Sequence, residues 1–265
     1  MTAPSAAFFD LDRTLIAGSS TFSFAIAAWR HGLLPTKMLA GDVTRAIGFR
    51  LFGATDDRSE TLKNRILDAV RGQDQSALLD LNDELIPELV SQVRDESFNL
   101  LTMHQEAGRD CFIVSAAPVE LVGPLAHALA FDGGIGTQAE RVDGRYTGEL
   151  DGPFVYGDGK AEAVQTLAAE RGYDLEKSYA YTDSVSDLPL LEMVGHPVAV
   201  NPDAALLAVA RKRGWPVVVF AERRKKVVRT TTALTTASAI ASVTYTLGRR
   251  HGRINERAKR RVPWR

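Results

Sequence analysis

The stretch Ala6-Ala7-Phe8-Phe9-Asp10-Leu11-Asp12-Arg13-Thr14-Leu15 decides the fold. Its four apolar residues predict a short buried strand, and the chain becomes polar where that strand ends. Asp10 and Asp12 are two residues apart, so in extended chain both carboxylates point to the same side. A strand that ends in paired carboxylates indicates a sheet with a functional edge at the carboxyl ends of its strands.

In three later segments a polar side chain again follows, or nearly follows, an apolar run. They are Phe112-Ile-Val-Ser115, Gly157-Asp-Gly-Lys160 and Tyr179-Ala-Tyr-Thr-Asp183-Ser-Val-Ser-Asp187. Loops at the carboxyl ends of parallel strands meet in one crevice. We therefore expect a single site made of Asp10, Asp12, Ser115, Lys160, Asp183 and Asp187. Such a set suits phosphoryl transfer.

The rest of the chain separates into a helical block and an alternating block. From about residue 20 to 108, apolar residues recur at helical spacing and predict four or five helices, the last near 92–108. One stripe consists of Leu78, Leu79, Leu81, Leu85, Ile86 and Leu89. Beyond it we expect strands at 111–114, 179–182, 197–200 and 216–220, and helices at 118–129, 187–194 and 204–213. Within 135–150, Asp143-Gly144 predicts a hairpin turn.

Alternating strands and helices predict an α/β fold with a Rossmann-like, doubly wound parallel sheet. We expect the core at 1–17 and 93–221, an inserted all-helical cap at 18–92 and a basic C-terminal helical tail at 222–265. A cap in this position covers the crevice, where it excludes water and selects substrate.

Charge and cysteine usage also limit the possibilities. The formal net charge is −1, yet residues 222–265 hold thirteen Lys and Arg against two acids, and residues 1–221 hold nineteen against thirty-one. Cys111 is the only cysteine, which excludes an intramolecular disulfide and predicts a buried strand thiol. The N-terminus has no basic stretch followed by an apolar one, so we expect no secretory signal and a cytoplasmic protein.

Each candidate residue also has a structural interpretation. A carboxylate can attack phosphorus and a second can carry protons, but strand-end aspartates also cap turns. Asp183 and Asp187 beside Asp10 would repel one another unless Mg²⁺ joined them. The alternative makes Asp187 the N-cap of a helix, with Pro189 in its first turn.

Ser115 and Lys160 suit the recognition of a phosphoryl group. The Ser115 hydroxyl and the backbone N–H groups that follow it, beginning with Ala116, suit a phosphate oxygen near a helix terminus. The Lys160 ammonium suits both the phosphate and Asp10. Read alone, these are a turn serine and an exposed lysine. Arg13 is expected to point away from the aspartates, and the five histidines lack zinc-ligand spacing.

Together the four segments resemble the haloacid dehalogenase (HAD) superfamily, in particular its phosphoserine-phosphatase-like subfamily IB, over roughly residues 6–220. The resemblance implies Asp10 as nucleophile and Asp12 as general acid/base. It implies that Ser115 and Lys160 bind the phosphoryl group. It also implies Mg²⁺ held by the Asp10 and Asp183 side chains and the Asp12 carbonyl, with Asp187 binding directly or through water.

The chain departs from the phosphoserine phosphatase pattern at three places. Ser115-Ala-Ala stands where those enzymes have Ser-Gly-Gly, and Thr182-Asp-Ser-Val-Ser-Asp where they have Gly-Asp-Gly-x-Asn-Asp. Residues 16–23 lack the glutamate that holds the substrate ammonium. Phosphatase chemistry is still expected, whereas these differences bear on phosphoserine as the substrate.

The basic tail has three interpretations. Residues 230–248 carry no charge and lie between clusters of cations, which gives the length of a membrane span. Seven of these residues are threonine and two are serine, so a basic amphipathic helix on an anionic lipid surface fits better. Its apolar face consists of Leu234, Ala237, Ile240, Ala241, Thr244 and Leu247. The third interpretation is a helix packed on the acidic body or a disordered tail.

The sequence thus predicts a Mg²⁺-dependent phosphatase that acts on a small, phosphoserine-like phosphomonoester through an aspartyl-phosphate. The first alternative is a lipid phosphomonoesterase, for example of the lysophosphatidate type, brought to the inner face of the membrane by the tail. The second is a non-catalytic binding module of the same fold. No nucleic-acid partner is expected, since the tail lacks interleaved aromatic residues.

Overall fold

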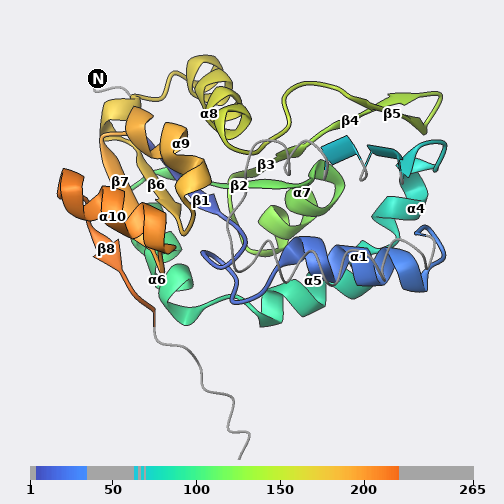
Figure 1. Cartoon of the computed structure of the whole chain (residues 1–265), viewed down its shortest axis with the longest axis horizontal. Coiled ribbons are helices and arrows are strands. Elements are labelled where there is room, and N and C mark those ends of the chain that lie inside the picture. The colour runs from blue at the N-terminus through green and yellow to red at the C-terminus, as the bar shows by residue number, and fades with distance from the viewer. Residues whose placement is uncertain (1–3, 35–62, 65–66, 69, 221–265) are drawn as a thin grey trace, which may run out of the picture. The chain divides into compact units, whose positions relative to one another are not determined.

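A six-stranded parallel sheet forms the centre of the computed structural model, which describes residues 4–34, 63–64, 67–68 and 70–220 (Figure 1). Its strands, in spatial order, are β3 (Gly133–Thr137), β2 (Asp110–Pro118), β1 (Ala6–Asp10), β6 (Tyr179–Thr182), β7 (His196–Val200) and β8 (Val217–Val218). The predicted doubly wound sheet is confirmed. The expected strand at 216–220 has only two residues. β3, a Gly-rich segment, joins the sheet beside β2 although half of it was expected to belong to a hairpin.

Alternation along the central strand divides the core into two layers. Ala7 and Phe9 of β1 face one cluster of buried residues, and Ala6 and Phe8 face the other. The first cluster is covered by α5 (Asn82–Ser91), α6 (Asp95–Glu106) and α7 (Val119–Ala128). The second is covered by α8 (Asp158–Arg171), α9 (Leu188–Met193) and α10 (Ala204–Arg213). Helices on both faces of a parallel sheet are what the doubly wound fold requires.

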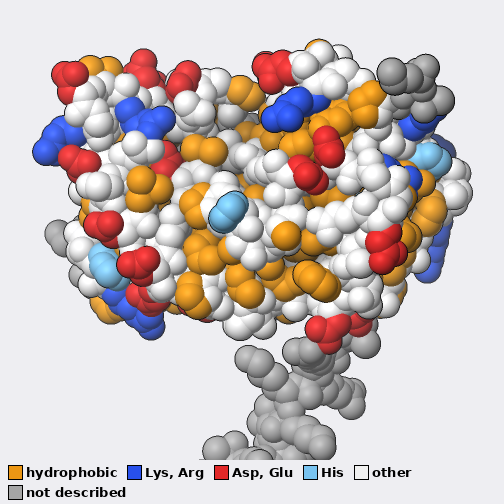
Figure 2. All heavy atoms as spheres, turned by 180° about the vertical axis from the view of Figure 1, so that it is seen from behind, with side chains coloured by type: hydrophobic (Ala, Val, Ile, Leu, Met, Phe, Trp, Pro, Cys, Tyr) orange, Lys and Arg blue, Asp and Glu red, His pale blue; other side chains and the backbone are white. Residues whose placement is uncertain are grey.

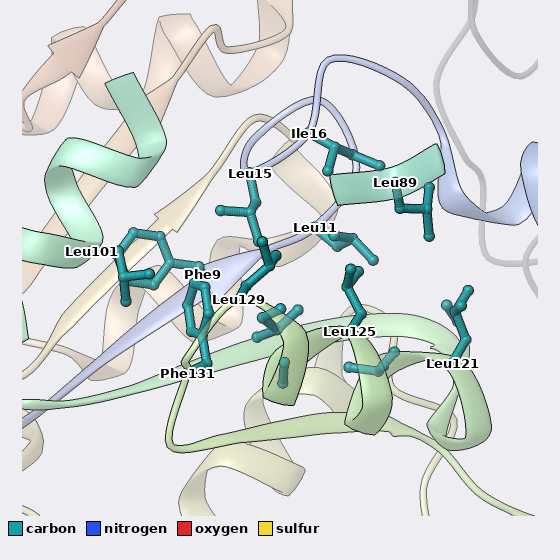
Figure 3. Close-up of a cluster of buried hydrophobic side chains, with 14 of the residues drawn as sticks. Phe9, Leu11, Leu15, Ile16, Leu89, Leu101, Leu121, Leu125, Leu129 and Phe131 are labelled. Atoms are coloured by element: carbon teal, nitrogen blue, oxygen red, sulfur yellow. The ribbon is translucent and has the colours of Figure 1, made fainter. Parts of the chain in front are cut away.

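The first cluster is built from large aliphatic side chains that are fully enclosed (Figure 3). Leu121 and Leu125 of α7 lie near Leu11, which follows the end of β1, while Leu101 of α6 and Phe131 flank Phe9. Burying one such side chain contributes about 1.5–3 kcal/mol. The packing of these side chains therefore stabilises the position of the loop that carries Asp10 and Asp12.

The helical insertion packs partly on this same core. Its described helices are α1 (Ser20–Arg30), α4 (Gln75–Leu79) and α5. In the predicted stripe Leu78, Leu81, Leu85 and Leu89 are buried, but Leu79 is 41 % exposed. Residues 35–62 of the predicted cap lie outside the described residues, so the division into cap (18–92) and core (1–17 and 93–221) stays a proposal.

The expected hairpin consists of the antiparallel strands β4 (Ala139–Val142) and β5 (Arg145–Leu150). Its turn residues Asp143 and Gly144 have φ values of 51° and 79°, the conformation for which an Asp-Gly pair is favoured. Tyr146 of β5 is buried with Val70 and Leu78, so the hairpin and the helical insertion share a small core. A hairpin thus accompanies the helices on the cap side.

The rear face of the molecule carries hydrophobic side chains gathered near its middle (Figure 2). On α5 and α6, Val90 and Phe98 are 38 % and 49 % exposed. They line a hollow of about 500 Å³ together with Val93, Arg94, Asp95, Asn99 and Leu129. Its lining includes none of the predicted site residues.

Within the described residues, none of the helices is both long enough and apolar enough to cross a lipid bilayer. The predicted tail at 222–265 lies outside these residues.

Candidate active site

Strand register brings the predicted site residues to one edge of the sheet. Asp10 ends β1 and pairs with Val114 of β2, so Ser115 is one residue further along the neighbouring strand. On the other side of β1, Phe9 pairs with Tyr181 of β6, and Asp183 follows the end of that strand. The central strand therefore delivers Asp10 between Ser115 and Asp183, as the sequence predicts.

Two glycines place Lys160 beside these aspartates. Gly157 precedes α8 with a φ of +56°, a backbone conformation that L side chains rarely adopt. A Cβ at Gly159 would lie 2.1 Å from the carbonyl oxygen of Phe154, so no side chain fits there. In this tight turn Lys160, in the first turn of α8, enters the protein and is only 3 % exposed.

The Lys160 ammonium joins segments that are far apart in the chain. Its Nζ lies 2.7 Å from Asp10 Oδ1 and 2.7 Å from Asp187 Oδ2. Thr182 donates a 2.6 Å hydrogen bond from its hydroxyl to the same Asp187 oxygen. The interpretation of Lys160 as an exposed surface lysine is therefore wrong.

Asp187 occupies the N-cap position of α9, but its side chain makes no capping hydrogen bond. The carboxylate turns toward Lys160 and Thr182 instead. Pro189 lies in the first turn of α9, as expected. Position and side chain thus have separate roles: the backbone begins a helix, and the carboxylate belongs to the polar site.

Arg13 differs from its prediction. Its guanidinium forms an ion pair with Asp183 Oδ2, whereas the sequence predicts that it points away from the aspartates. The reason is its backbone, which has a φ of +62° and so leaves the extended conformation on which that prediction relied. The Arg13 N–H donates a 3.2 Å hydrogen bond to the Gly18 carbonyl, which fixes this turn.

Asp12 is tied to the helical insertion rather than to the lysine. Its Oδ1 accepts a 2.8 Å hydrogen bond from the Ser20 N–H, and its Oδ2 accepts a 3.2 Å bond from the Ser19 hydroxyl. Both residues begin α1. The carboxylate therefore satisfies N–H and O–H donors at the start of a helix, where negative charge is favoured. No sequence pattern predicts this contact.

Ser115 is buried near the end of β2, and its hydroxyl accepts a 3.2 Å hydrogen bond from the Ala117 N–H. β2 continues to Pro118, and α7 begins at Val119, one residue later than predicted. The register between β2 and β3 shifts between Val114 and Pro118. Ser115 and Ala116 thus lie in extended but irregular chain next to Asp10.

Asp203 supports the site from the next loop. The segment Asn201-Pro202-Asp203 has a composition typical of a turn and helix cap. Asp203 does cap α10, by accepting a 2.7 Å hydrogen bond from the Leu206 N–H. Its second carboxylate oxygen accepts from the Val185 N–H at 3.1 Å, and its own N–H donates to the Asp183 carbonyl at 2.8 Å. The capping role was predictable, whereas the contacts with the Asp183 loop were not.

Burial and crowding shift the pKa values of the site. Burial, followed by repulsion from Asp187 and Asp12, raises the pKa of Asp10 to about 6 although Lys160 opposes the shift. Burial and repulsion from Asp10 raise the pKa of Asp183 to about 8, against the pull of Arg13. For Lys160, burial lowers the pKa, but Asp10 and Asp187 outweigh it and hold the pKa above its ordinary value. Negative charge here exceeds what the protein's own cations offset.

This donor set fits a hard divalent cation in chemistry and in charge. Asp10, Asp183 and Asp187 are buried carboxylates, the ligands that Mg²⁺ prefers, and with Asp12 they outnumber the two cationic side chains. As they stand, no three His, Cys, Asp or Glu side chains of the described residues are grouped closely enough to hold a metal ion. Lys160 bridges two of these carboxylates, and Arg13 holds the third.

Comparison with known proteins shows the family. The chain belongs to the haloacid dehalogenase-like hydrolase family, whose model matches residues 7–192. It is 38 % identical to a probable phosphatase of Mycobacterium tuberculosis, over 94 % of this chain and 92 % of that protein. It is 36 % identical to a phosphoserine phosphatase of the same organism, over 83 % of this chain and 72 % of that protein. It is 33 % identical to a histidinol-phosphatase of Neisseria meningitidis, over 81 % of this chain and 98 % of that protein. The protein is a phosphomonoester hydrolase.

Solved structures agree on the fold. A protein of unknown function from Bordetella pertussis matches with a TM-score of 0.71 and 29 % identity, over 82 % of this chain and 99 % of that one. A phosphoserine phosphatase, solved as an analogue of its phospho-aspartyl intermediate, matches with a TM-score of 0.60 and 15 % identity, over 86 % and 99 %. At that identity the second likeness concerns the fold alone.

Proposed function

We propose that this phosphatase hydrolyses a small, phosphoserine-like phosphomonoester through an aspartyl-phosphate on Asp10, with Mg²⁺ as its cofactor. The observation that carries the proposal is the position of the Lys160 ammonium, 2.7 Å from both Asp10 and Asp187 at the carboxyl edge of the sheet. It supports a site in which the nucleophile and the metal-binding loop share one cation.

In the first step, an oxygen of Asp10 forms a bond to phosphorus while the ester P–O bond breaks. Asp12 gives its proton to the departing oxygen, so that the leaving group departs as an alcohol. Asp12 lies two residues beyond Asp10 and is held by Ser19 and Ser20, which keeps the two carboxylates in separate places.

In the second step, Asp12 takes a proton from water, whose oxygen attacks phosphorus. The bond between Asp10 and phosphorus breaks, which releases inorganic phosphate and regenerates the carboxylate. Ser115, the backbone N–H of Ala116 and Lys160 bind the phosphoryl oxygens throughout. Lys160 also holds Asp10 in place before substrate arrives.

Mg²⁺ would be held by the side chains of Asp10 and Asp183, the Asp12 carbonyl and Asp187, directly or through water. When bound, it would offset the charge of these carboxylates and of the phosphoryl group.

The identity of the substrate rests on relatives and on composition. The names of two relatives, a phosphoserine phosphatase and a histidinol-phosphatase, support a phosphomonoester of a small amino alcohol. We also propose that the enzyme is cytoplasmic and that the basic residues of 222–265 bring it to an anionic membrane surface. A panel of amino-acid, histidinol, sugar and lipid phosphates, assayed with Mg²⁺ or chelator, separates these substrate classes.

Substitution of the nucleophile tests the chemistry. Asp10→Asn keeps the shape but removes the attacking charge, so turnover should fall by several orders of magnitude. Asp158→Asn is the matched control because Asp158 is exposed in the same Gly-Asp-Gly-Lys segment that delivers Lys160, and it should leave turnover unchanged. Near-normal turnover by Asp10→Asn, or full activity in excess chelator, contradicts the proposal.

A further inference from the structure

Arg13 places a positive charge beside Asp183 of the proposed metal site. It directly follows Asp10-Leu11-Asp12, and its backbone has a φ of +62°, which is uncommon for a residue with a long side chain. The hydrogen bond from its N–H to the Gly18 carbonyl, 3.2 Å long, keeps the turn in this form. In this conformation the partly exposed side chain reaches Asp183.

The two cations of the site differ in how deeply they are enclosed. The Lys160 side chain is 4 % exposed and bridges Asp10 and Asp187. The Arg13 side chain is 44 % exposed, while its partner Asp183 is 6 % exposed. Displacement of the Lys160 ammonium would leave two buried carboxylates unpaired. The Arg13 guanidinium, by contrast, borders solvent and can move into it.

The geometry points to Arg13 as a resident cation that a divalent metal ion must displace from Asp183. A carboxylate oxygen paired with a guanidinium is a poorer ligand for Mg²⁺, and the freed guanidinium remains a nearby positive charge. Arg13 therefore stabilises the metal-free site and raises the Mg²⁺ concentration that the enzyme needs. This inference rests on the proposed metal site.

Equilibrium Mg²⁺ binding to the full chain tests it without any assay of activity. Titration calorimetry would compare the wild type with Arg13→Asn, which removes the charge but accepts a positive φ. Arg13→Lys retains a charge at the same position. Arg30→Gln is the matched control because it removes another arginine from an ion pair, with Glu84, outside the site.

We expect the Mg²⁺ dissociation constant of Arg13→Asn to fall about tenfold, as for the loss of a partly buried competing ion pair. Arg13→Lys should stay within about threefold of the wild type, and Arg30→Gln should match it. As a second readout, the rise in Tm that Mg²⁺ causes, measured for each variant against its own metal-free form, should be largest for Arg13→Asn.

The outcomes separate this inference from the proposed function. Unchanged or weaker Mg²⁺ binding by Arg13→Asn, with measurable binding by the wild type, overturns the role of Arg13 and leaves the metal site intact. An absence of Mg²⁺ binding by every form, including the wild type, overturns the metal site and the inference together.

Discussion

Two buried polar clusters lie against the same sheet, and they differ in whether their buried groups are neutral or charged. One lies beside β6, near the start of β2, and contains His104, Arg109 and Tyr181. The other lies where β1 and β6 end and contains Asp10, Lys160, Asp183 and Asp187. In the first cluster, a neutral imidazole at the centre uses both of its ring nitrogens in hydrogen bonds. The second keeps several charges out of water.

In the first cluster, His104 forms hydrogen bonds with both of the other residues. Its Nδ1 accepts a 2.7 Å hydrogen bond from Arg109 Nε, so the neutral ring carries its proton on Nε2. That nitrogen lies 2.8 Å from the Tyr181 hydroxyl and donates to it. Burial, with a smaller contribution from Arg109, lowers the pKa of His104 to about 4. The cluster is therefore neutral at the imidazole and has no need of a ligand.

At the second cluster, burial raises the pKa of two carboxylates and leaves negative charge unbalanced. Perturbed acids in a partly compensated set are typical of functional sites. The contrast indicates that incomplete pairing of charges, rather than burial of polar groups as such, distinguishes the candidate active site from a structural network.

The largest effect should come from removing the buried cation. In Lys160→Met the side chain keeps its length, but Asp10 and Asp187 lose their shared partner. We expect kcat/KM to fall about 10³-fold and the free energy of unfolding to fall by about 3 kcal/mol. Steady-state kinetics and urea denaturation measure the two losses.

Lys177→Met is the control for this change because Lys177 is 55 % exposed and pairs with Asp174 on the surface. It should alter neither quantity by a measurable amount. If Lys160→Met behaved like Lys177→Met, the charges at the second cluster would be no more critical than surface charges.

A smaller effect, confined to stability, should come from the first cluster. Its imidazole has a pKa of about 4 in the folded protein, against an ordinary value of 6.5. Between pH 6.5 and 4, the unfolded chain therefore binds a proton that the folded protein does not bind. The stabilisation is complete above pH 6.5 and is lost as the pH falls. Between pH 7 and 4.5, His104 should account for about 2–3 kcal/mol.

Comparison of the same pH interval in His104→Asn and His127→Asn isolates this contribution. The buried-site variant should lose that part of the pH dependence, whereas the variant at the exposed His127 should retain it. An unchanged pH dependence in His104→Asn would mean that His104 is not held neutral by the fold.

The smallest effect on chemistry should come from the tail, which carries neither cluster. A chain that ends at residue 221 keeps the whole unit from Met1 to Phe220 and should turn over a soluble phosphomonoester at an almost unchanged rate. The full chain should sediment with anionic vesicles, less so as salt is raised, and the truncated chain should not.

Vesicle binding that resists high salt would favour insertion over surface attachment. If the full chain bound no vesicles and truncation lowered stability, the tail would belong to the fold instead.

How much of the fold and of the candidate site the sequence predicts depends on whether a feature follows from local sequence patterns or from contacts in the folded chain. The sheet was predictable because apolar runs mark its strands, and the meeting of Asp10, Ser115, Lys160 and Asp183 follows from parallel topology. The place of β3 was not predictable, because a Gly-rich strand lacks the side chains that mark a strand.

The details of the site required the folded backbone. The contact of Arg13 with Asp183 depends on a positive φ at Arg13, which the amino-acid sequence does not reveal. The hold of Ser19 and Ser20 on Asp12 depends on where α1 begins. Similarly, Leu79 fits the helical stripe by spacing but lies at the end of the short helix α4, where it is exposed.

The most direct test of the central claim is to find the phosphoryl group on the protein. Asp12→Asn removes the proposed general base for water, so an intermediate formed from a reactive aryl phosphate should accumulate. Acid quenching followed by peptide mass spectrometry should locate a phosphoryl group on Asp10, and hydroxylamine should remove it, as expected of an acyl-phosphate. A phosphoryl group on another residue, or continued turnover with none on Asp10, would contradict the aspartyl-phosphate mechanism.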